Sequence, residues 1–321
     1  MEKIPEIDLC KGVAIILVIL GHSFILYPIN LMAVEWCKYT NSILSSFHLA
    51  TFFFISGFLF TFSIKKSYGK ILKSKCMRLL IPYIAFAIVN LMIKICFPTL
   101  MNRKIDDIGE YVEKLLLYGG ELWFVYSLFT MFFIWGFILK YFNRRAVVII
   151  ILLLYVLDSI CPRMGSDIFL NGKFVHYSIF FLLGYFIGPK YLHYISRSVL
   201  FTSLMLFILF SIALLYFEFP MCIYNIYTFI GIIFCLAICY AIKSGVLHNV
   251  LSYFGKYSLQ FYIFNGFMLV PTRFVLCNLL HIDNSFVIVL GVFIACIFGE
   301  FLIIEFLKRI KLARYVFSIP T

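Results

Sequence analysis

Charge is the scarcest property of this sequence. Of its 321 residues only 13% are charged, whereas 64% are hydrophobic, and the mean hydropathy is +1.03. A soluble domain is about half apolar and a quarter charged, so this chain has too few polar residues to cover a surface in water. The composition excludes a soluble protein and predicts one that lies in a lipid bilayer, with length enough for several spans.

Acidic residues are fewer than basic ones, 15 against 27, which gives a net charge of +12 at pH 7. The basic residues are dispersed over many loops, and no soluble basic domain gathers them, so this charge does not indicate nucleic-acid binding. It indicates contact with anionic lipid headgroups.

Linkers, low-complexity tracts and obvious repeats are also missing from the chain. We therefore predict a single integral-membrane domain over residues 1–321. The first apolar segment has no small-residue cleavage site and carries His22, so we interpret it as a span and not as a removable signal peptide.

Cysteine is plentiful, with ten residues, but no pair has C-x-x-C spacing. Cys235 and Cys239 share a helix face, although neither His nor an acid flanks them. We interpret the cysteines as small residues buried in the lipid phase and predict no metal site.

Long apolar runs dominate the rest of the sequence. Most approach the ~20 residues that a helix needs to cross a bilayer. They are continuous, which favours helices over a β-barrel. We predict an all-α fold, a polytopic transmembrane helical bundle of about ten spans. The segments are 12–29, 44–64, 79–98, 122–142, 146–160, 174–188, 198–217, 222–242, 257–280 and 285–307.

The segments 146–160 and 174–188 are short, so tilted, thinned or partly re-entrant helices remain open there. The connection 99–121 is acidic, and we expect a short surface helix in it.

The basic residues predict the orientation of the bundle. If the N-terminus is cytoplasmic, 19 of the 27 Lys and Arg residues lie on the inner side and 7 on the outer side, with Lys94 inside a span. This bias follows the positive-inside rule and predicts that both termini are cytoplasmic.

Two polar residues of the first segment predict a site. Lys11 and His22 are eleven residues apart, which on a helix is three turns plus ~20° and about 16 Å. They therefore lie on one face, which Asp8 joins. Ionisable groups within spans are functional candidates because they are costly to insert. The spacing predicts a cavity that binds an anion at its cytoplasmic mouth and transfers protons deeper, although a packing role for His22 is the alternative.

Five sequence blocks resemble, in order, the acyltransferase-3 family of polytopic membrane O-acyltransferases. EIDLCKGVAIILVILGHS (6–23) is similar to the first span of the family, and FHLATFFFISGFLF (47–60) resembles its second-span motif. The other three blocks are KCMRLLIPY (75–83), ELWFVYSLF (121–129) and FGKYSLQFYIFNGF (254–267).

This chain departs from the family pattern at two positions. The commonest form of the family has Arg where this chain has Lys11, but a subgroup resembling fucose-type sugar O-acetylases uses Lys. The late motif usually ends in His, whereas this chain has Asn265.

The resemblance implies a function and its substrates. The donor would be cytosolic acetyl-CoA, with no bound cofactor. The acceptor would be a sugar hydroxyl of a bacterial surface polysaccharide or its lipid-linked precursor. The expected location is the bacterial cytoplasmic membrane. Two alternatives are a transporter of a lipid or glycan intermediate and a non-catalytic relative, although no duplicated halves of the kind typical of transporters are evident.

The resemblance also suggests roles for individual residues. His22 is the candidate catalytic base, because an imidazole with a pKa of about 6.5 can take and return a proton near neutral pH; a role as nucleophile stays open. Lys11, Lys75 and Arg78 would bind the phosphates of coenzyme A. The alternative for Lys75 and Arg78 is ordinary positive-inside anchoring.

Further polar residues are candidates for binding the acceptor or supporting the site. The structural alternatives are an interfacial histidine for His48, a small packing pair for Ser56 with Gly57, and an interfacial Trp for Trp123, while a proton relay and a buried pair are both open for Glu300. We expect Asn265 to bond the thioester or a hydroxyl, and Glu300 to pair with a cation or with His22. The set is His48, Ser56, Glu121, Trp123, Asn265 and Glu300.

Overall fold

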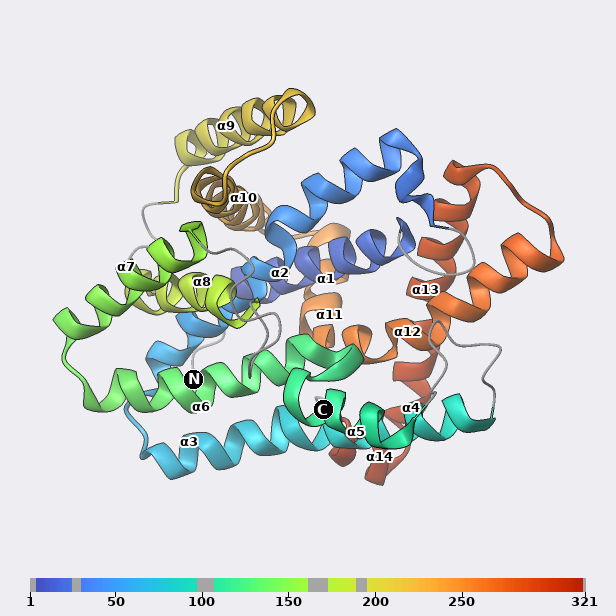
Figure 1. The fold of residues 1–321 in the computed structure, drawn as a ribbon, viewed down its shortest axis with the longest axis horizontal. Helices are drawn as coiled ribbons and strands as arrows, with labels where there is room; N and C mark the ends of the chain where they lie inside the picture. Colours follow the sequence, from blue (N-terminus) through green and yellow to red (C-terminus); the bar gives the residue numbers. More distant parts are fainter. Residues whose placement is uncertain (1–3, 25–29, 97–106, 161–172, 189–194, 320–321) are drawn as a thin grey trace.

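The structure is a computed structural model that describes residues 4–24, 30–96, 107–160, 173–188 and 195–319. Within these ranges the regular elements are helices, and none of the described residues lies in a strand (Figure 1). The predicted all-α polytopic bundle is confirmed. Its α-helices are α1 (Pro5–Phe24), α2 (Glu35–Ser63), α3 (Tyr68–Lys75), α4 (Ile81–Cys96), α5 (Ile108–Tyr118), α6 (Trp123–Tyr141), α7 (Arg144–Ile160), α8 (Lys173–Ile187), α9 (Arg197–Tyr216), α10 (Met221–Ala241), α11 (Val246–Lys256), α12 (Ser258–Phe274), α13 (Ser285–Leu307) and α14 (Lys311–Val316).

Short 3-10 and π turns complete the described elements. The 3-10 turns are η1 (Leu31–Ala33) and η4 (Gly120–Leu122). The π turns are η2 (Cys76–Leu80), which joins α3 to α4, and η6 (Val275–Leu279), which follows α12.

Eight helical stretches in the described residues are long and apolar enough to cross a membrane. The helices α7 and α8, with 17 and 15 residues, are shorter, as the sequence predicted for these two segments. All ten predicted segments overlap helices, although residues 25–29 and 97–98 of two of them lie outside the described residues. The count of ten spans and the cytoplasmic termini stay predictions.

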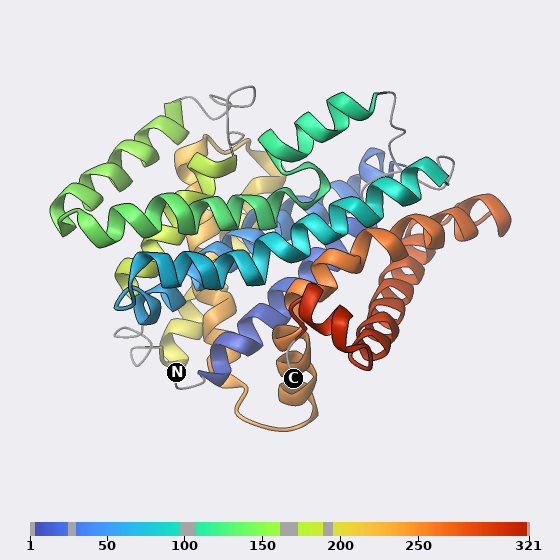
Figure 2. The same ribbon diagram turned by 90° about the horizontal axis from the view of Figure 1, so that it is seen from below.

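The helix α1 occupies the centre of the bundle. It packs against α2, α10, α11, α12 and α13, and Figure 1 shows it surrounded by them. A second layer consists of the continuous stretch α3–η2–α4 and of α6, which run side by side in opposite directions across one face (Figure 2). The side chains of α1 therefore point at other helices rather than at lipid.

Glycines allow two helix pairs to touch backbone to backbone. A Cβ on Gly12 of α1 would lie 2.0 Å from the carbonyl oxygen of Leu251 in α11. A Cβ on Gly57 of α2 would lie 1.8 Å from the carbonyl oxygen of Phe181 in α8. No larger residue fits at either place without a shift of the backbone, so these contacts set how closely the helices approach.

The connection 99–121 contains the expected surface helix, α5. The Asp107 side chain caps its start by accepting a hydrogen bond from the Gly109 amide, and Gly119 ends it with φ at 77°. A left-handed C-terminal residue is a conformation that glycine adopts at little cost. Residues 99–106 of this connection lie outside the described residues.

Candidate active site

Three helices contribute a chain of hydrogen bonds around His22, in the last turn of α1. The Nδ1 atom of His22 lies 2.7 Å from Oδ1 of Asn265 in α12. The Nδ2 atom of Asn265 donates in turn to Oε1 of Glu300 in α13, at 2.8 Å. Asn265 and Glu300 are buried and His22 is half-buried, so the ring faces the interior and not lipid.

This chain of bonds assigns the proton on the imidazole. Asn265 uses its Nδ2 as a donor to Glu300, so the atom that faces His22 is the amide oxygen, which only accepts. His22 must then donate through Nδ1. In the neutral ring Nε2 carries no proton and is free to accept one, which is what a general base requires.

The partners of Glu300 and Asn265 differ from those expected. Glu300 was expected to pair with a cation or with His22 directly, but its Oε1 accepts from Asn265. Its Oε2 is buried and has no hydrogen-bond partner among the described residues. Asn265 was expected to bond a substrate, but both polar atoms of its amide are engaged by protein, because His22 lies on one side of it and Glu300 on the other.

A second histidine lies beside His22. His48 of α2 is buried, donates through Nδ1 to the carbonyl oxygen of Leu44, and lies near His22. It lies next to Gly21 of α1, where an added Cβ would be in ordinary contact with Cε1 of His48 at 3.9 Å and with Oδ1 of Asn41 at 3.6 Å. The sequence singled out His48 but missed Asn41.

Cations gather around Lys11, in the second turn of α1. Lys11 Nζ lies 3.0 Å from Oδ1 of Asp8, so the predicted polar stripe is formed. Lys75, at the end of α3, is close enough to Lys11 and Arg78 for their charges to repel, and its Nζ lies 3.6 Å from the centre of the Phe132 ring.

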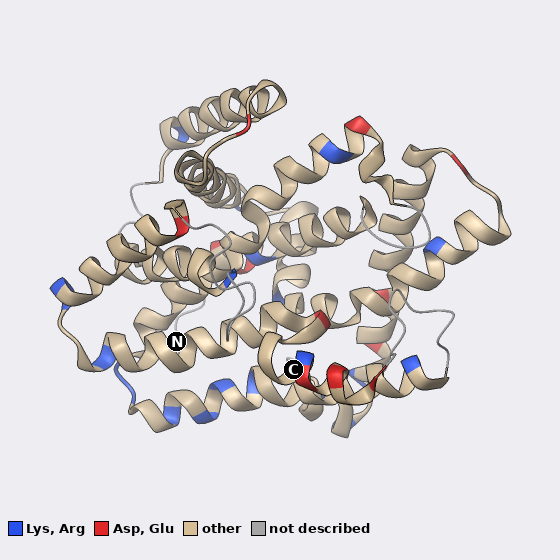
Figure 3. Ribbon diagram, viewed as in Figure 1, with Lys and Arg blue, Asp and Glu red and all other residues tan. Residues whose placement is uncertain are grey.

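This cation cluster has excess positive charge. Within the described part of the chain, Asp8 is the only acid that forms an ion pair with Lys11, Lys75 or Arg78. The π turn η2 carries Arg78, and such turns are frequent at functional sites. Figure 3 shows further basic residues spaced along α3. A cluster of three cations with a single acidic partner is suited to bind a ligand with several negative charges.

Glu121 and Trp123 lie apart from the His22 chain of bonds. Glu121 is exposed and accepts hydrogen bonds from Asn90 and from the buried Lys94, so its carboxylate already has partners in the protein. Trp123 stacks on Tyr177 at 5.8 Å between ring centres, with Lys173 Nζ 4.1 Å from the centre of the Trp123 ring.

Ser56 also lies outside the chain of bonds: it is half-buried and forms no hydrogen bond to His22, Asn265 or Glu300. Its neighbour Gly57 is at the close contact between α2 and α8, which matches the packing alternative for this pair.

The sequence reasoning missed another buried polar group. His176 Nδ1 of α8 lies 3.0 Å from Oδ2 of Asp158 in α7, and the same oxygen accepts from Asn225 of α10 at 2.9 Å. Asp158 and His176 are ionisable groups in apolar segments, which is the signal that singled out His22. That signal could have found the two residues, although not their pairing.

The family model Acyl_transf_3, described as an acyltransferase domain, matches residues 4–305. The chain belongs to the acyltransferase-3 family. Comparisons with curated proteins and with solved structures found no match. The match covers both the cation cluster and the His22 chain of bonds, and together with the long apolar helices it makes the chain a multi-pass membrane acyltransferase.

Proposed function

We propose that this acyltransferase is an O-acetyltransferase of the bacterial cytoplasmic membrane. It moves an acetyl group from cytosolic acetyl-CoA to a sugar hydroxyl of a surface polysaccharide or its lipid-linked precursor. The family membership supports acyl transfer, and the acetyl group and the sugar follow the family resemblance noted in the sequence.

One observation carries this proposal. The single helix α1 holds Lys11, within the cation cluster, and eleven residues later His22, whose Nε2 is free to accept a proton. The two residues are about 16 Å apart along the helix. Acetyl-CoA has the matching layout, because its phosphates and its thioester lie at opposite ends of a long flexible arm.

The proposed reaction starts with the acceptor. His22 Nε2 removes the proton of the sugar hydroxyl as the oxygen attacks the thioester carbonyl. The carbon–sulfur bond then breaks, and the thiolate of coenzyme A takes the proton from the imidazolium. The products are the acetylated sugar and free coenzyme A, and His22 returns to its neutral state.

Asn265 and Glu300 position the base in this scheme. Asn265 Oδ1 accepts the Nδ1 proton, which orients the ring and stabilises the imidazolium that forms during the reaction. Glu300 holds the amide in the orientation that keeps its oxygen toward His22. A fixed ring requires less reorganisation when the transition state is reached.

The test replaces His22 with alanine in the full chain reconstituted in lipid nanodiscs and supplied with radiolabelled acetyl-CoA and the surface glycan of the host. We expect transfer to fall by at least ~100-fold, the contribution of a general base. The matched control is His248→Ala, at a half-buried position on α11, which should keep wild-type transfer. In cells, the glycan of a deletion strain should lose the mass of one acetyl group per modified sugar.

Three outcomes would overturn parts of the proposal. Transfer retained by His22→Ala would remove this residue from the chemistry. Movement of a glycan across the bilayer without acetylation would indicate a transporter. A wild-type protein that neither acetylates nor transports would be a non-catalytic member of the family.

A further inference from the structure

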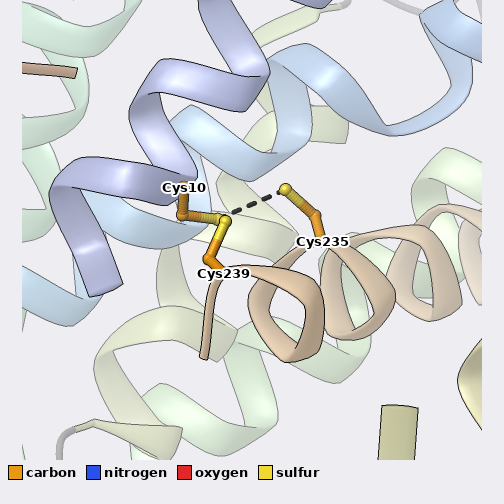
Figure 4. A group of neighbouring side chains, drawn as sticks. All are labelled: Cys10, Cys235 and Cys239. Atoms are coloured by element: carbon orange, nitrogen blue, oxygen red, sulfur yellow. Dashed lines mark hydrogen bonds between the residues drawn. The ribbon is translucent and has the colours of Figure 1, made fainter. Parts of the chain in front are cut away.

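Three cysteines that are far apart in the sequence meet inside the bundle. Cys10 comes from α1, and Cys235 and Cys239 come from successive turns of α10 (Figure 4). Their sulfur atoms all lie within 4.8 Å of one another, and those of Cys10 and Cys235 are 3.4 Å apart. All three residues are at most 2% exposed.

We propose that Cys10, Cys235 and Cys239 form a buried three-sulfur site for a soft monovalent metal ion, copper(I). Nothing in the acyl-transfer scheme uses these thiols, so the site is independent of the proposed function. The close grouping also distinguishes them from Cys37 and Cys296, the other cysteines that are buried in the described part of the chain.

The spacing of the sulfurs suits one ion. A thiolate binds a first-row metal such as zinc at ~2.3 Å. An ion at this distance from three sulfurs in a trigonal arrangement keeps them about 4 Å apart. The Cys10 and Cys235 sulfurs are somewhat closer than this, at 3.4 Å, and no pair of the three is more than 4.8 Å apart. Small rotations of the side chains are then enough to close the site.

The ligands select the kind of ion. Sulfur ligands favour copper(I), zinc and iron–sulfur clusters. Zinc in a structural site takes four ligands, and the group contains only three His, Cys, Asp or Glu residues within the described part of the chain. The three cysteines are buried among apolar residues such as Ile7, Ile55 and Ile232, which offer no further ligand. A three-coordinate soft ion fits this environment better than zinc.

Binding of the ion releases protons, because a cysteine binds a metal as its thiolate. Each sulfur that binds Cu⁺ loses its proton to the surrounding buffer, and the copper stays in the +1 state throughout. A bound ion would join α1 to α10 at the residue directly before Lys11, and it would stabilise the fold.

The binding test uses the full chain in nanodiscs, kept reduced with ascorbate and titrated with copper(I) against bathocuproine disulfonate, a chelator specific for this ion. We expect one copper per chain held against the chelator. The variants Cys10→Ser and Cys239→Ser should bind at least tenfold more weakly. The control Cys296→Ser changes another fully buried cysteine, on α13, and should bind as the wild type does.

A second measurement uses only the wild-type protein, so it does not depend on whether the cysteine variants fold. It records X-ray absorption by the copper-loaded protein to identify the atoms bound to the copper. We expect three sulfur neighbours at about 2.3 Å and no nitrogen or oxygen neighbour. A nitrogen shell would assign the copper to histidines and overturn the proposal. So would equal binding by Cys10→Ser, failure of the wild type to compete with the chelator, or a Cys10–Cys235 disulfide in the protein as isolated.

Discussion

Asn265 stands where the late motif of the family usually has histidine. In the structure its amide connects His22 to Glu300, which supports the positioning role that we propose for it. An amide does not take a proton near neutral pH, but it can both accept and donate a hydrogen bond. A positioning role therefore requires only that these two bonds form.

The first prediction concerns this amide. In Asn265→Ala the Nδ1–H of His22 loses its acceptor, and the ring loses its fixed orientation. A hydrogen bond to a charged group contributes about 1.5–3 kcal/mol, so we expect kcat to fall by roughly 10- to 100-fold. The KM for acetyl-CoA should stay within about twofold, because the cation cluster is unchanged. Steady-state kinetics with labelled acetyl-CoA measures both constants.

The control for this prediction is Asn249→Ala, an exposed amide on α11, which should leave both constants unchanged. If kcat of Asn265→Ala stays at the wild-type value, the amide does not position His22. A rise in KM alone would place Asn265 in substrate binding, as the sequence first suggested.

At the scale of elements, helix contacts through glycine decide where the functional side chains lie. Gly12 lets α1 touch the backbone of α11, and Gly57 lets α2 touch that of α8. The helix α1 carries Lys11 and His22, and α2 carries His48, so a shift of either helix would move parts of the site.

The second prediction compares two glycine-to-alanine changes. In Gly57→Ala the new methyl group would meet the Phe181 carbonyl at 1.8 Å, and a backbone atom cannot move aside as a flexible side chain does. Overpacking of this kind costs about 1–3 kcal/mol or more. We expect a lower midpoint of thermal unfolding, measured by size-exclusion chromatography after heating in detergent.

The matched change is Gly69→Ala in α3, where no atom lies within 4 Å of the added Cβ. Alanine favours a helix over glycine by up to ~1 kcal/mol, so this variant should unfold at the wild-type temperature or slightly above. Equal midpoints for Gly57→Ala and Gly69→Ala would show that the contact between α2 and α8 does not limit stability.

At the scale of the whole molecule, the charge distribution predicts the orientation in the membrane. Figure 2 shows the start of α1 and the end of α13 toward the same edge of the bundle. The cation cluster of Lys11, Lys75 and Arg78 would then face the cytosol, where acetyl-CoA is made available. This orientation follows from the excess of basic residues on the predicted inner side.

The third prediction tests this topology with reporter fusions. Alkaline phosphatase fused after Glu113, on α5, should be active because that helix is expected on the outer side. The same reporter fused after Lys66, between α2 and α3, should be inactive, whereas green fluorescent protein at that place should fluoresce. The reverse pattern would put the cation cluster outside and contradict a cytosolic donor.

The sequence alone was enough to predict that the protein lies in a lipid bilayer and that it is built from helices. It also predicted that Lys11 and His22 share one face of α1. Apolar composition and run length are properties of each segment by itself, so they predict membrane helices without knowledge of packing. The spacing of Lys11 and His22 likewise depends only on helical periodicity, and both residues lie on the continuous helix α1. The two short segments also proved to be the short helices α7 and α8.

Only the tertiary structure decided the partners of these residues. His22 and Asn265 are 243 positions apart in the chain, and Cys10 and Cys235 are 225 apart. No local pattern encodes such pairs, because they depend on which helices pack against α1 and at what rotation. For the same reason the sequence could mark Glu300 and Asp158 as costly groups in apolar segments, but not that Asn265 and His176 would be their hydrogen-bond partners.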